Sequence, residues 1–151
     1  MAPSGPSFAG AKILLVEDDP EAAELLRLAF QKAGLRRPLR VLPDGEKAVA
    51  YLSGDPPYDN SEENPAPCLV LLDLKLPRRS GLDFLAWIKQ RPELAGIPVI
   101  VLSSSQEACD LDRAYELGAK SYLVKSVELK ELMKVAEGIA AYAALLGPKS
   151  T

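Results

Sequence analysis

Five short apolar segments, each followed by a stretch with helical periodicity, constrain the fold of this chain more than any other feature. Segments at 13–16, 40–42, 68–72, 98–102 and 121–124 have the length and composition of strands. Most are apolar throughout, as expected of strands that are covered on both faces. A regular alternation of strands and helices favours parallel pairing with right-handed crossovers. The sequence therefore predicts an α/β fold, a doubly wound five-stranded parallel sheet with helices on both faces.

Residues that favour helix N-termini precede three of the stretches with helical periodicity. Asp19, followed by proline, caps the first helix, and Asp44 caps the second. Ser80 begins the third helix. Apolar residues three and four positions apart give these helices an inner face. The expected helices cover about residues 20–33, 45–52, 80–88, 106–117 and 127–146.

The segment 53–67 interrupts this alternation without ending it. It contains four prolines and several acidic residues, and it has no lysine or arginine. Because the strand and helix pattern resumes after it, we interpret it as a loop and not as a domain linker. The expected organisation is one domain over 12–147, with a flexible N-terminal tail over 1–11 and a C-terminal tail over 148–151.

Composition excludes several kinds of chemistry. The chain has no histidine, which removes Ser-His-Asp and Cys-His triads, histidine-ligated zinc sites and a histidine general base. The formal net charge of −3 argues against direct nucleic-acid binding through overall basicity. Any chemistry must therefore use carboxylates, hydroxyls, lysines or a bound metal.

Cysteine usage and the apolar runs bear on location. Cys68 and Cys109 show no metal-binding or redox spacing and are expected to be free thiols in a reducing compartment. The N-terminal residues lack the pattern of a signal peptide, and no apolar run approaches 18 residues. We expect a cytoplasmic protein without a membrane segment.

Polar side chains gather where the predicted strands end. Glu17 and Asp18 follow the first strand, Asp73 the third, Ser103 the fourth and Lys125 the fifth. If the first and third strands are neighbours, the three carboxylates converge, and each pair at 4 Å would repel by about 4 kcal/mol at an effective dielectric of 20. Such a cluster suits Mg²⁺. With the hydroxyl and the lysine, it predicts a pocket for a phosphoryl group beside a metal.

Four segments carry a resemblance to a known family. ILLVEDD, LVLLDLKLPRRSG, IPVIVLSSS and SYLVKS are together similar to the receiver domains of two-component response regulators, and the likeness extends over residues 11–146. The family implies a flavodoxin-like (βα)5 fold with strand order 2-1-3-4-5.

The resemblance also implies roles for the residues at the strand ends. By position, Asp73 resembles the phosphoacceptor and also a metal ligand. Asp18 resembles the direct Mg²⁺ ligand, with Glu17 acting through water and the backbone carbonyl of Lys75 as a further ligand. Lys125 resembles the lysine that pairs with the phosphoryl oxygens.

Other positions match residues that respond to phosphorylation. Ser103 resembles the switch hydroxyl and Tyr122 the switch aromatic ring. Lys75 and Ser105 lie two residues after the acceptor and switch positions, and we hypothesise that they affect the lifetime of the phosphoryl group. Ser126 replaces the proline that usually follows the lysine, which puts the family's cis peptide at that position in question.

The expected function is that of a single-domain response regulator that accepts a phosphoryl group from a sensor histidine kinase onto Asp73 with Mg²⁺. It would not be an enzyme in the usual sense, but a signalling domain with self-catalysed phosphotransfer and slow autodephosphorylation. Two alternatives remain open: an unphosphorylated pseudo-receiver scaffold, and a Mg²⁺-dependent aspartyl-phosphate phosphatase. The phosphatase would need a second acid two residues after its nucleophile, where this chain has Lys75.

The expected output is a changed protein–protein interaction, because few residues follow the last predicted helix. The lysine–serine pair, the long acidic loop and the segment YELGAKSYLVKS resemble single-domain regulators that partner phytochrome histidine kinases. A homodimer through the fourth helix, fifth strand and fifth helix is also expected. Its surface would use apolar residues that the core leaves over: Val135, Tyr142, Leu145 and Leu146.

Overall fold

Five parallel strands form a single sheet in the order β2-β1-β3-β4-β5. A computed structural model describes residues 13–34, 39–60, 62–103, 108–125 and 128–145. The strands are β1 (Ile13–Val16), β2 (Leu39–Leu42), β3 (Leu69–Leu72), β4 (Val99–Ser103) and β5 (Ser121–Val124). The predicted flavodoxin-like order is confirmed, with β1 and β3 adjacent at the centre of the sheet.

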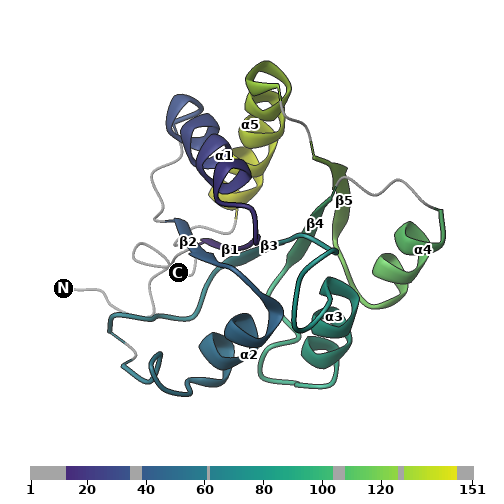
Figure 1. Ribbon diagram of the computed structural model, residues 1–151. Helices are drawn as coiled ribbons and strands as arrows, with labels where there is room; N and C mark the ends of the chain where they lie inside the picture. Colours follow the sequence, from purple (N-terminus) through teal and green to yellow (C-terminus); the bar gives the residue numbers. More distant parts are fainter. Residues whose placement is uncertain (1–12, 35–38, 61, 104–107, 126–127, 146–151) are drawn as a thin grey trace.

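Helices cover both faces of the sheet (Figure 1). They are α1 (Pro20–Lys32), α2 (Gly45–Ser53), α3 (Gly81–Lys89), α4 (Ala108–Glu116) and α5 (Leu129–Leu145). α1 and α5 pack together on one face, and α2, α3 and α4 lie on the other. This arrangement is the doubly wound fold predicted from the alternation of strands and helices.

The predicted N-caps of the first two helices are confirmed, and Ser80, predicted to begin the third helix, is its N-cap. The side chain of Asp19 accepts a hydrogen bond from Glu21 N at 3.0 Å, and that of Asp44 accepts one from Lys47 N at 2.8 Å. Ser80 caps α3 through its hydroxyl. Side-chain acceptors at these positions satisfy amide groups that have no partner inside the helix.

Two apolar clusters form the core, one on each face of the sheet. Ile13 and Leu15 belong to the cluster beneath α1 and α5, whereas Leu14 and Val16 belong to the cluster beneath α2 and α3. Successive side chains of a strand point to opposite faces, so a central strand must be apolar at every position. This explains the wholly apolar sequence of β1 and β3.

The register of the central strands determines which residues lie side by side at the carboxyl ends of the strands. Val16 is paired with Leu72, so β1 and β3 end side by side. Asp73 N donates to Val16 O at 3.1 Å, and Glu17 N donates to Leu42 O at 3.0 Å. The residues directly after β1 and β3 therefore share one edge of the sheet.

The predicted 53–67 loop is folded against the domain between α2 and β3. The Tyr51 hydroxyl donates to Pro65 O at 2.8 Å, and Arg40 Nη1 donates to Asn64 Oδ1 at 3.2 Å. The Arg40 guanidinium also lies 5.6 Å from the ring centroid of Tyr51 and 5.5 Å from that of Tyr58. These contacts anchor the acidic segment, as expected of a loop within one domain.

None of the described helices is both long enough and apolar enough to cross a membrane. The predicted tails, 1–11 and 148–151, lie outside the described residues, so the predicted domain boundaries stay a prediction.

Candidate phosphoryl and metal site

Three carboxylates converge at the carboxyl edge of β1 and β3, as predicted. Glu17 and Asp73 are buried, with 5% and 6% of their surface exposed, whereas Asp18 is exposed. One carboxylate oxygen from each of the three lies within 4.8 Å of the others. Hard oxygen donors this close together fit a divalent cation with one exposed ligand and room for water.

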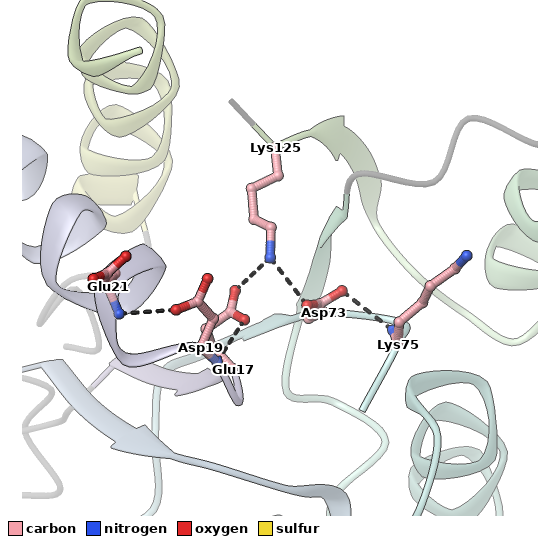
Figure 2. A network of polar contacts seen from close by, with 6 residues as sticks. All are labelled: Glu17, Asp19, Glu21, Asp73, Lys75 and Lys125. Atoms are coloured by element: carbon pink, nitrogen blue, oxygen red, sulfur yellow. Dashed lines mark hydrogen bonds and ion pairs between the residues drawn. The ribbon is translucent and has the colours of Figure 1, made fainter. Parts of the chain in front are cut away.

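Lys125 reaches this cluster from the end of β5 (Figure 2). Its Nζ lies 2.7 Å from Glu17 Oε1 and 3.0 Å from Asp73 Oδ2. The ammonium group therefore bridges the acids that follow the first and third strands. The predicted position of Lys125 is confirmed. It follows the edge strand β5, and its ammonium group contacts one acid that follows β1 and one that follows β3.

The charges in this cluster shift the ionisation of its members. Burial raises the pKa of the Glu17 carboxyl above its usual value, and hydrogen bonds from Lys125 and from the Asp19 amide oppose this rise. Burial by itself lowers the pKa of Lys125, but its hydrogen bonds to Glu17 and Asp73 and their negative charges outweigh burial and raise it. The lysine is thus held in its charged form.

The Asp73 carboxylate is oriented from two sides. Its Oδ2 accepts from Lys125, and its Oδ1 accepts from the backbone N–H of Lys75 at 3.2 Å. Figure 2 shows both contacts on the one carboxylate. This amide contact could not be predicted from the sequence, because a backbone donor leaves no trace in residue type. The roles predicted for Lys75 are those of a carbonyl ligand and of a side chain that affects the phosphoryl lifetime.

The Lys75 side chain is exposed and directed away from Asp73 (Figure 2). The side chain does not contact the Asp73 carboxylate, and its predicted contact with a phosphoryl group on Asp73 stays a prediction. Ser105, the other residue assigned to phosphoryl lifetime, lies outside the described residues, as does Ser126 with the peptide bond that precedes it.

The two predicted switch residues lie on neighbouring strands. Ser103 is the last residue of β4 and is paired with Val124 of β5, but its side chain is not among those described. Tyr122 of β5 is half-buried and packs against the core cluster beneath α2 and α3. Their strand positions agree with the prediction, while their switch roles stay predictions.

The prediction for the surface of α5 is correct only in part. Leu145 is 70% exposed, as expected of a residue that the core does not use. Val135 and Tyr142 instead pack against the core cluster beneath α1 and α5, and they line a groove of about 540 Å³ between α5 and β5. The apolar face of α5 is wider than the single stripe assumed from the sequence. Leu146 lies outside the described residues.

The fold and the site together define an α/β domain of the flavodoxin-like kind, with an acidic cation site and a lysine at the carboxyl edge of the sheet. Residues 13–137 match the family described as the response regulator receiver domain. The chain belongs to this family, as the sequence indicated.

Individual relatives are similar to this chain in sequence and structure over most of its length. The response regulator Rcp1 of Synechocystis sp. is 42% identical over 130 residues, which make up 86% of this chain and 86% of Rcp1. The crystal structure of the Mn²⁺-bound form of Rcp1 gives a TM-score of 0.79 at 40% identity, covering 88% of this chain and 94% of that one. The structure of the phosphorylated cyanobacterial phytochrome response regulator RcpA gives a TM-score of 0.81 at 36% identity. It covers 89% of this chain and 94% of that one.

Proposed function

We propose that this chain is a response regulator that accepts a phosphoryl group on Asp73 from the phosphohistidine of a sensor histidine kinase. The observation that carries the proposal is the placement of the Asp73 carboxylate. It is buried beside two further acids, and its two oxygens face the Lys125 ammonium and the Lys75 amide. The phosphorylated state of the similar protein RcpA supports the same role here.

In the proposed reaction a carboxylate oxygen of Asp73 forms a bond to phosphorus while the bond from phosphorus to the donor imidazole breaks. The leaving imidazole stays on the kinase, and the chain supplies no histidine of its own. Lys125, already 3.0 Å from Asp73 Oδ2, would pair with the transferred phosphoryl oxygens. The domain would thus catalyse its own phosphorylation and would also dephosphorylate itself slowly, without acting as a conventional enzyme.

We assign Mg²⁺ to the acidic cluster, with Asp18 and Asp73 as direct ligands, Glu17 acting through water and the Lys75 carbonyl as a further ligand. A bound Mg²⁺ would neutralise the negative charge shared by the acids and the phosphoryl group. The three carboxylates within 4.8 Å support this assignment, as does the Mn²⁺-bound form of the similar protein Rcp1.

We infer that phosphorylation changes the surface formed by α4, β5 and α5. A phosphoryl group adds about −1.5 to −2 charges at Asp73. Ser103 would donate a hydrogen bond to it, and the half-buried Tyr122 ring would move into the space that Ser103 leaves. The similarity to phytochrome response regulators supports a phytochrome kinase as the phosphoryl donor.

We further propose that the output is a homodimer through the same three elements. The exposed side chain of Leu145 and the apolar groove beside Val135 and Tyr142 support an apolar contact surface on α5. Sedimentation of the wild type and of Leu145→Glu tests this. We expect a dimer that the substitution weakens, and a wild type that stays monomeric at high concentration rejects it.

The phosphoacceptor role is tested by intact mass after incubation with Mg²⁺ and acetyl phosphate, with the wild type beside Asp73→Asn. We expect one phosphoryl adduct on the wild type and none on the variant. Absence of the adduct on a wild type that binds Mg²⁺ would favour the scaffold alternative. Continuous release of phosphate from an added phosphate monoester such as p-nitrophenyl phosphate would instead favour the phosphatase, in which Asp73 would be the nucleophile.

A further inference from the structure

The loop that follows Asp73 has an unusual backbone at Arg78. Among the described residues other than glycine, only Arg78 has a positive φ, at 70°. A side chain in the left-handed region costs roughly 1 kcal/mol or more, so the surrounding contacts must hold it there. Those contacts come from α2, which lies on the same face of the sheet as α3 (Figure 1).

Asp44 is the first of these contacts. It is 4% exposed and uses both oxygens: Oδ1 accepts from Lys47 N at 2.8 Å, and Oδ2 lies 3.4 Å from Arg78 Nε. A single buried carboxylate thus caps α2 and pairs with the loop after β3. A helix cap alone would need only one of these oxygens.

Gly45 provides the second contact. A Cβ at Gly45 would lie 2.3 Å from the backbone oxygen of Arg79 and 2.7 Å from its Cβ. The first residue of α2 therefore packs directly against the backbone of the loop. We call Asp44, Gly45, Arg78 and Arg79 the α2 junction.

The other end of the loop bears on the functional site. Gly81 N donates to Leu74 O at 2.9 Å and closes the loop at its base. Lys75, the residue after Leu74, donates its backbone N–H to Asp73 Oδ1. The loop 74–80 is thus fixed at two places, at the α2 junction and beside the Asp73 carboxylate.

We propose that Asp44 and Arg78 are positioning residues for the acidic cluster. The α2 junction fixes the path of the loop, so that the Lys75 amide holds Asp73 in the rotamer that faces Glu17 and Asp18. Neither residue touches the cluster itself. The inference rests on the proposed function for its phosphoryl site, but its test needs only cation binding.

The main test is the Mg²⁺ dissociation constant of Arg78→Gly, measured by calorimetry on the unphosphorylated full chain. Glycine adopts the left-handed backbone at no steric cost, so the variant loses the ion pair without added strain. Residues that orient metal ligands change affinity about 10- to 100-fold, and since Arg78 is largely exposed we expect weakening of roughly three- to tenfold. The melting temperature without metal should change little.

Two further variants separate positioning from general stability. Asp44→Asn keeps an N-cap residue of similar quality but loses the charge, and it should weaken Mg²⁺ binding by a similar factor. Arg78→Lys keeps the charge and should restore most of the affinity. The double variant Asp44→Asn with Arg78→Gly should bind Mg²⁺ no more weakly than either single variant, because both substitutions remove the same contact.

The matched control is Arg27→Ala, which removes one positive charge from an exposed ion pair on α1. It should leave the dissociation constant within about twofold, as expected for a distant exposed charge. Unchanged Mg²⁺ affinity in both Arg78→Gly and Asp44→Asn overturns the inference, as does a lower melting temperature with unchanged affinity. If the wild type binds Mg²⁺ but never accepts a phosphoryl group, the proposed function fails and the inference stands.

Discussion

Lys125 and Glu17, which are 108 positions apart in the sequence, form a hydrogen-bonded ion pair of 2.7 Å at the carboxyl edge of the sheet. The side chain of Glu17 is almost fully buried, and that of Lys125 is 20% exposed. The same ammonium contacts Asp73, so one lysine offsets the charges of two acids. In the proposed function, a lysine in this position would compete with a bound cation for carboxylate oxygens and would also bind the phosphoryl group.

Lys125→Ala should therefore change two properties in opposite directions. Mg²⁺ should bind more tightly, because the substitution releases Glu17 Oε1 and Asp73 Oδ2 from the ammonium. The rate of phosphorylation by acetyl phosphate should fall by about 100-fold, the usual loss when one charged donor is removed. Calorimetry and the rate of adduct formation by mass measure the two effects, and weaker binding together with an unchanged rate would contradict the assignment.

The sequence predicted the parts of this site that depend on strand order. Glu17, Asp73 and Lys125 each follow an apolar segment, and parallel strands place their carboxyl ends at one edge. The contacts of Arg78 with Asp44 and of the Lys75 amide with Asp73 could not be predicted, because they depend on the backbone path of one loop. The packing of Val135 and Tyr142 was missed because helical periodicity does not give the width of a buried face.

Gly81→Ala should disturb the site through the backbone. A Cβ there would lie 2.5 Å from the Asp73 carbonyl oxygen and 2.6 Å from Leu74 Cα, and neither backbone atom can move freely. Overpacking of this kind costs about 1–3 kcal/mol, and phosphorylation should slow as well. Gly96→Ala is the control, since its Cβ would meet nothing within 4 Å. Urea unfolding of both variants should show a loss of stability for Gly81→Ala and none for Gly96→Ala.

Tyr51→Phe should change stability most below the pKa of tyrosine. Burial raises the pKa of Tyr51 above the ordinary tyrosine value of 10.0, and the charge of Arg40 opposes this. The unfolded chain therefore ionises first as the pH rises, and the contribution of the folded phenol is present below pH 10.0 and lost above it. The variant also loses the hydrogen bond to Pro65, worth about 1 kcal/mol. Urea unfolding from about pH 8 to 11 should show the wild-type advantage shrinking as the pH rises.

Lys75→Ala should alter the lifetime of the phosphoryl group on Asp73. The Lys75 side chain is exposed, so it can rotate towards a new negative charge within nanoseconds and shield it from water. The decay of the adduct, followed by mass after the donor is removed, gives the half-life. Equal half-lives for wild type and variant would rule out this role, and Ser105→Ala tests the companion position in the same assay.

Asp18→Asn should separate metal binding from folding. Asp18 is exposed, and the other two acids of the cluster remain paired with Lys125, so the fold does not need its charge. Removing one of three neighbouring carboxylates relieves repulsion, and the melting temperature without metal should stay level or rise. Mg²⁺ affinity should fall by about 10-fold or more, since a charged ligand is lost. Calorimetry with Mg²⁺ and thermal unfolding in a chelator test both effects. A variant that is less stable without metal but binds Mg²⁺ normally would show that Asp18 serves the fold and not the cation.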